Sequence, residues 1–182
     1  MKPVFALLFC TFLAHGQQQS GVQAEWDVTQ TLDALSAQAK RLKPILDQLT
    51  PQQWIAKGAP DTYVKQWKNS QDELGYLVDT AKNLEKQPER LTVALETYFR
   101  MQSLEMQLRS LADGVRNYQN PAVGDLLIGV LSENSSNRDK LRQYITDLAV
   151  TKEQEFKVVD QEAQRCRGVL SRQPARPATK KQ

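Results

Sequence analysis

The sequence predicts an all-α fold: an elongated antiparallel helical bundle with coiled-coil-like seams and a long C-terminal helix. Three observations support this prediction. Apolar residues recur every three or four positions over long stretches, prolines separate these stretches, and runs that alternate apolar and polar residues, as half-buried strands require, are scarce. The 182 residues are 40% hydrophobic and 25% charged, which is typical of a globular domain and not of a disordered chain.

The first helical stretch begins near residue 25 and shows the pattern most clearly. Seven apolar residues are spaced alternately by four and three positions, which places them on one side of a helix. They are Val28, Leu32, Leu35, Ala39, Leu42, Leu46 and Leu49. Thr50-Pro51 then predicts the capped start of a short helix, which Gly58 closes.

Prolines also mark the starts of the next two helices. Pro60-Asp61 begins the second long stretch, and Pro88-Glu89 begins a third of roughly 30 residues, about 45 Å long. The short connection between them makes the two helices antiparallel neighbours. Charge pairs with the acid four residues before the base support the helices. They are Asp61 with Lys65, Glu96 with Arg100, Glu105 with Arg109, and Glu153 with Lys157.

Asn120-Pro121 caps the last stretch, which continues to about residue 172. Residues 132–140 contain no apolar side chain, and two interpretations are open. We favour a continuous helix; the alternative is a break with a new start at Ser136, which has an acid three residues later. A continuous helix of roughly 50 residues is about 75 Å long and outruns its partners. Its apolar stripe then needs cover from a turned-back segment, a second copy or another protein.

Residues 1–24 have the pattern of a cleaved secretory signal peptide. Lys2 precedes an uncharged, largely apolar run over 4–14, which is too short to span a bilayer. Cleavage is expected after Ala24, with Gly16 as the alternative. We therefore expect an exported protein, periplasmic or secreted, with no transmembrane span once the signal is removed. The helical domain then covers 25–172, and 173–182 forms a disordered basic tail.

Cleavage removes His15 and Cys10, so the exported chain has no histidine and a single cysteine, Cys166. Histidine is the usual general base, nucleophile activator and metal or haem ligand of secreted enzymes. We therefore expect no catalytic residues, no bound cofactor and no metal site. The predicted function is that of a non-enzymatic protein that binds another protein or a second copy of itself, as a scaffold or chaperone-like factor.

Charge is divided unevenly along the chain. Residues 163–182 contain six basic residues and no acid, whereas 25–162 carry a net charge of −4. The tail includes Arg172, Arg176, Lys180 and Lys181. Six charges without interleaved aromatics are too few to predict nucleic-acid binding. We interpret the tail as a solvated end; a tether to an anionic envelope surface is the alternative.

Two apolar segments are the predicted partner-binding surface: the apolar run after Pro121 and the overhanging last helix. Their candidate contact residues are Leu126, Leu127, Leu131, Leu141, Ile145, Leu148, Phe156 and Val159. Binding is expected to proceed by burial of one helix against another.

Two further features have competing interpretations. Trp54, Tyr63 and Trp67 either pack the end of the bundle, which we favour, or line an inter-helical pocket for a small apolar ligand. Cys166 follows the spacing of the apolar stripe, so we expect it to be a buried core residue and expect no disulfide-linked dimer. The alternative is an exposed thiol that pairs with another chain.

Overall fold

The computed structural model describes residues 25–133 and 135–172, and within these ranges it contains α-helices and no strand. The helices are α1 (Glu25–Asp47), α2 (Pro51–Ile55), α3 (Thr62–Lys86), α4 (Leu91–Tyr118), α5 (Pro121–Glu133) and α6 (Ser135–Arg172). The prediction of an all-α fold is confirmed. α3, α4 and α5 each begin within three residues of the proline expected to mark the start of a helix.

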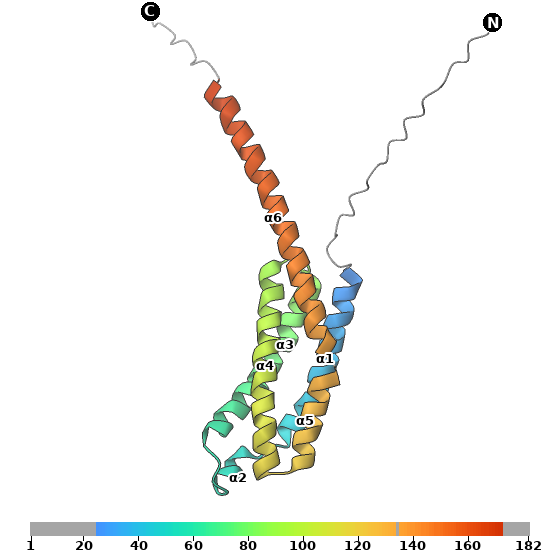
Figure 1. The fold of residues 1–182 in the computed structure, drawn as a ribbon, viewed down its shortest axis with the longest axis vertical. Helices are drawn as coiled ribbons and strands as arrows, with labels where there is room; N and C mark the ends of the chain where they lie inside the picture. The colour runs from blue at the N-terminus through green and yellow to red at the C-terminus, as the bar shows by residue number, and fades with distance from the viewer. Residues whose placement is uncertain (1–24, 134, 173–182) are drawn as a thin grey trace, which may run out of the picture.

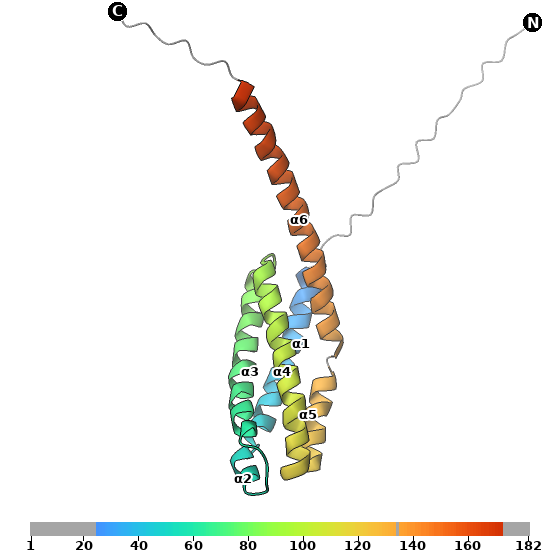
Figure 2. The same ribbon diagram turned by 60° about the vertical axis from the view of Figure 1, so that its left-hand side comes forward.

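The helices form an antiparallel four-rod bundle in which α5 and the first half of α6 together make the fourth rod (Figure 1). α1 packs against α3 on one side and against α5 and α6 on the other, and α4 closes the square by contacting the same neighbours. The chain runs down α1, up α3, down α4 and up through α5 and α6 (Figure 2). The short α2 lies at the end of the bundle where α1 ends and α3 begins.

The core follows the predicted stripe of α1 closely. All seven of its 4-3 spaced apolar residues are buried, with Leu46 completely inaccessible. At the start of α4 the fully buried positions are small residues and not the large apolar ones. Leu91, Leu95 and Tyr98 are only half-buried, and the small residues Ala94 and Thr97 are fully buried instead.

The connections between helices explain where the helices end. Gly58 has φ 87°, a left-handed conformation that favours glycine, in the turn between α2 and α3. Asn120 caps α5, because its Oδ1 accepts a hydrogen bond from the Ala122 amide at 2.9 Å. Thr50 does not act as the predicted side-chain cap of α2; its hydroxyl makes no capping bond.

The fourth rod divides near the polar segment 132–140. α5 ends at Glu133 and α6 begins at Ser135, while Asn134 lies outside the described residues. The choice between a continuous helix and a fresh start therefore falls on a position that the structure does not describe. Beyond this junction α6 continues past the end of the other rods, as expected for a helix that outruns its partners (Figure 1).

Candidate interaction surface

The sequence-predicted contact residues fall into two groups. Leu127, Leu141 and Leu148 are buried, with exposed fractions of 0%, 2% and 3%. Leu131 and Ile145 are half-buried and pack against the same core. These five are core positions, which corrects the prediction that they form a contact surface. The physical reason is that α5 and the first half of α6 lie along α1 and α4 and already bury this stripe.

The other predicted contact residues are exposed but do not lie in one place. Leu126 is 54% exposed and lies on α5, which is part of the bundle itself. Phe156 and Val159 are 73% and 66% exposed on the part of α6 that extends beyond the bundle. The structure therefore brings only the last two together as a surface.

We call residues 153–172 of α6 the projecting segment. Among the described side chains of α6, Leu148 is the last that is fully buried, and every side chain from 153 to 162 is exposed. Twenty residues of α-helix extend about 30 Å. Both views show this half of the helix free of the other rods (Figures 1 and 2).

An apolar stripe runs along the projecting segment. Phe156, Val159, Ala163 and Cys166 follow one another at intervals of three, four and three residues, so they share one side of the helix. Val169, 59% exposed, extends the stripe one turn beyond Cys166, and Val158, also 59% exposed, lies further round the helix; neither was predicted from the sequence. At about 100° per residue, the stripe lies within roughly 50° of the buried face formed by Leu141 and Leu148. The core-facing side of α6 thus continues, uncovered, beyond the bundle.

Cys166 is exposed, which corrects the prediction that it is a core residue. Cys166 does lie on the apolar stripe, as its spacing predicted. At its position, however, no other described rod reaches α6 to cover that stripe.

Charge along the projecting segment changes sign at its middle. Residues 153–162 contain four acids and one lysine, a net charge of −3, whereas 163–172 contain three arginines and no acid, +3. An ion pair of 2.9 Å between Glu162 and Arg165 spans the boundary. The basic residues Arg176, Lys180 and Lys181 lie outside the described residues, and only the backbone of Arg172 is described.

The predicted aromatic site is a packed cluster at the α2 end of the bundle. Trp54 is 1% exposed and meets Tyr63 edge-on, with ring centroids 5.7 Å apart. Tyr118, which the sequence did not indicate, stacks on Trp54 at 6.5 Å. A Cβ added at Gly114 would lie 2.8 Å from Tyr63 and 3.0 Å from Trp54, so the rings fill the space beside α4. This geometry fits the favoured interpretation, the packing of the bundle end.

Trp67 lies apart from that cluster and is tied to α1. Its indole Nε1 donates a hydrogen bond to the Leu46 carbonyl at 2.8 Å. The three aromatic residues therefore do not line one common pocket.

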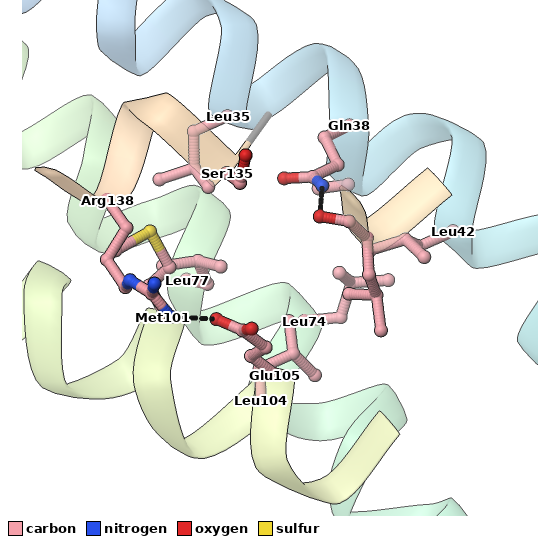
Figure 3. Close-up of a pocket in the computed structure, with 12 residues that line it drawn as sticks. Leu35, Gln38, Leu42, Leu74, Leu77, Met101, Leu104, Glu105, Ser135 and Arg138 are labelled. Atoms are coloured by element: carbon pink, nitrogen blue, oxygen red, sulfur yellow. Dashed lines mark hydrogen bonds and ion pairs between the residues drawn. The ribbon is translucent and has the colours of Figure 1, made fainter. Parts of the chain in front are cut away.

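A small cavity lies inside the bundle between α1, α3, α4 and the start of α6 (Figure 3). Its volume of about 40 Å³ has room for a few water molecules and not for an organic ligand. Leucines and Met101 form most of its wall, and the ion pair of Arg138 with Glu105, 3.2 Å, lies at its rim. The buried Asn137 Nδ2 has no hydrogen-bond partner within the described residues.

A larger groove of about 290 Å³ opens on the surface between α1 and α3. Leu46, Leu74 and Val78 form its apolar floor, and Gly75 widens it, because a Cβ at this glycine would meet nothing within 4 Å. Lys40, Lys43, Asp47 and Asp79 surround it with charge.

Two arginines connect neighbouring helices through carboxylates. The hydrogen bond to Glu96 raises the pKa of Arg100, and Glu73 on α3, 3.3 Å away, adds to it. The hydrogen bond to Asp125 on α5 likewise raises the pKa of Arg116. Because arginine is charged at any physiological pH, both pairs are structural ties between helices and not proton-transfer groups.

The described residues contain no candidate membrane span and no candidate metal site. None of the described helices is both long enough and apolar enough to cross a membrane. No group of three or more potential metal-ligating side chains was found in the same part of the chain.

Comparisons with protein-family models, with curated proteins and with solved structures gave no match to this chain.

Proposed function

We propose that this protein is an exported, non-enzymatic binding protein that captures a helical protein partner on the projecting segment of α6. The observation that carries the proposal is the apolar stripe around Phe156 and Val159, which continues the core-facing side of α6 where no bundle helix covers it. Contiguous exposed apolar surface on a soluble domain marks an interaction site.

The bundle holds the binding element in place. The first half of α6 is anchored by Leu141, Tyr144 and Leu148, each at most 3% exposed. A helix that is already formed and held at one end loses less conformational entropy when it binds a partner than a free peptide of the same sequence would. Export is inferred from the signal-like residues 1–24, and the lack of histidine after 24 supports a role without catalysis.

Site-specific photo-crosslinking tests this proposal. A photoreactive phenylalanine analogue at position 159 should give a crosslinked product in the native compartment, and the Phe156→Asp substitution should abolish it. The matched control places the analogue at Met106, which is 69% exposed on α4, and should give no specific product. Equal crosslinking from both positions, or a product that survives Phe156→Asp, would contradict the proposal.

A second candidate function, transport of a small apolar ligand, is supported by the groove between α1 and α3. Its volume of about 290 Å³ is at the lower end of the range for small-molecule sites. The fluorescence of Trp67 should report binding in the groove, because its indole is hydrogen-bonded to the carbonyl of Leu46, which lines the groove.

Binding of the apolar fluorophore N-phenyl-1-naphthylamine tests this alternative. Its emission should rise on binding, Trp67 fluorescence should shift, and Gly75→Leu should prevent both by filling the groove. An unchanged signal with the wild-type protein, or full binding by the Gly75→Leu variant, would remove the alternative.

A further inference from the structure

We infer that the partner of the projecting segment is a second copy of this chain, with the two segments packed antiparallel. This inference rests on the proposed function and specifies its partner. Two observations support it: the apolar stripe that needs cover and the reversal of charge at the middle of the same 20 residues.

The charge pattern matches itself only when one copy is reversed. An antiparallel neighbour places its 163–172 half, at +3, beside the 153–162 half, at −3, and the two-fold symmetry repeats the match. A parallel neighbour would place −3 beside −3 and +3 beside +3. At about 100° per residue, Glu155, Asp160, Glu162 and Arg167 lie within about 80° of the centre of the apolar stripe. Charges that flank an apolar seam in this way set the orientation of a helix pair.

The apolar stripe is compatible with this reversal. Its intervals of three, four and three residues, from Phe156 to Cys166, read the same in both directions. In the half-on-half arrangement, Phe156 and Val159 of one copy lie opposite Val169 and Cys166 of the other, so apolar residues meet on both sides of the two-fold axis. The bundles of the two copies lie at opposite ends of the paired helices, because each segment projects beyond its own bundle.

The exposed Cys166 distinguishes the two orientations. In a parallel pair with aligned segments, the two Cys166 residues lie side by side and oxidise readily to a disulfide. In the half-on-half antiparallel pair, Cys166 lies opposite residue 159 of the second copy, seven residues or about 10 Å from the other thiol. That separation exceeds the reach of a disulfide.

Sedimentation of the purified protein tests the inference. We expect a monomer–dimer equilibrium that shifts toward monomer as ionic strength rises from about 0.05 to about 0.5 M, because salt screens the flanking charges. Glu155→Lys with Asp160→Lys should weaken the dimer on the order of tenfold or more, and so should Arg165→Glu with Arg167→Glu. All four substitutions in one chain give halves of +1 and −1, which are again opposite in sign, so the fourfold variant should recover part of the lost affinity.

The control is Lys65→Glu with Lys68→Glu, which makes the same change in charge on exposed positions of α3 and should leave the dimer unchanged. A dimer that strengthens with salt, that fails to recover in the fourfold variant, or that forms a Cys166 disulfide under mild oxidation would overturn the antiparallel assignment. A strictly monomeric protein whose position 159 crosslinks to a different protein would overturn the second copy as partner and leave the proposed function standing.

Discussion

At the scale of single residues, Gln119 holds together the end of the bundle. Its Oε1 accepts hydrogen bonds from the Trp54 indole at 3.1 Å and from the Thr50 amide at 3.0 Å. Its Nε2 donates to the Gln48 carbonyl at 3.1 Å. One side chain after α4 thus satisfies groups from both ends of the turn between α1 and α2. A lone glutamine after a helix has no sequence signal, so its role emerges only from the fold.

Replacing Gln119 by leucine should lower the free energy of unfolding by about 2–3 kcal/mol. The buried Trp54 indole and the Thr50 amide would then lack an acceptor, and an unsatisfied buried donor is costly. Urea denaturation monitored by circular dichroism measures the loss. Gln102→Leu is the matched control, since the Gln102 amide makes one described hydrogen bond, to the Tyr98 hydroxyl at 2.9 Å, and its loss should cost less than about 1 kcal/mol. Equal losses in the two variants would show that Gln119 has no special role.

Leu148 and Phe156 lie two turns apart on α6, but substitution by aspartate should reduce the stability of the fold only at Leu148. Leu148→Asp should destabilise the fold by about 3 kcal/mol or more, because it places a carboxylate in a site that is 3% exposed. Phe156→Asp should change the melting temperature by less than about 2 °C, since its side chain is 73% exposed. Thermal melts of the two proteins decide between core and surface. A folded Leu148→Asp protein of normal stability would contradict the packing described for α6.

At the scale of helices, α5 packs on α4 through a glycine. A Cβ added at Gly124 would lie 2.8 Å from the Ala112 carbonyl oxygen and 2.6 Å from Arg116 Cγ. The backbone carbonyl cannot move aside, so the two helices would have to separate. Gly129, one and a half turns further along α5, has nothing within 4 Å of its Cβ position.

These two glycines of one helix therefore form a matched pair. Gly124→Ala should destabilise the protein by about 1–3 kcal/mol through the clash with α4. Gly129→Ala should stabilise it by about 0.5–1 kcal/mol, because alanine favours the helix without meeting a neighbour. Urea denaturation of both variants gives the comparison. Stabilisation by both substitutions would show that α4 and α5 are not in close contact.

Helical spacing predicts which side of a helix is apolar, but it does not identify the neighbour. The seven residues of the α1 stripe all lie in the core as predicted, because α1 contacts other rods along its length. At the start of α4 the small Ala94 and Thr97 are fully buried whereas Leu91 is half-buried, a difference that helical spacing alone does not indicate. In α6 one spacing continues from Leu148 to Cys166, yet the bundle ends between them. The lengths of the helical stretches predicted that the last helix outruns its partners, but only the fold shows the residue at which the cover of its apolar stripe ends.

At the scale of the whole molecule, stability and the proposed binding activity reside in different parts of the chain. The buried apolar residues of the described structure lie between Val28 and Leu148, within the four-rod bundle. Among its described side chains, the projecting segment adds no fully buried apolar residue to this core. Its removal should therefore leave the bundle intact.

A chain that ends at Lys152 is expected to separate the two properties. It should unfold at the same temperature as the full protein, within about 2 °C, because the lost residues bury little apolar surface against the bundle. Its helical circular-dichroism signal should fall only by the contribution of the 20 residues removed. It should sediment as a monomer at every concentration. A chain that ends at Arg172 is the control; because it keeps the paired segment, it should still dimerise. If removal of 153–172 lowers the melting temperature as strongly as a core substitution does, the segment packs on its own bundle in solution. The apolar stripe would then be part of the fold and not the surface that recognises a partner.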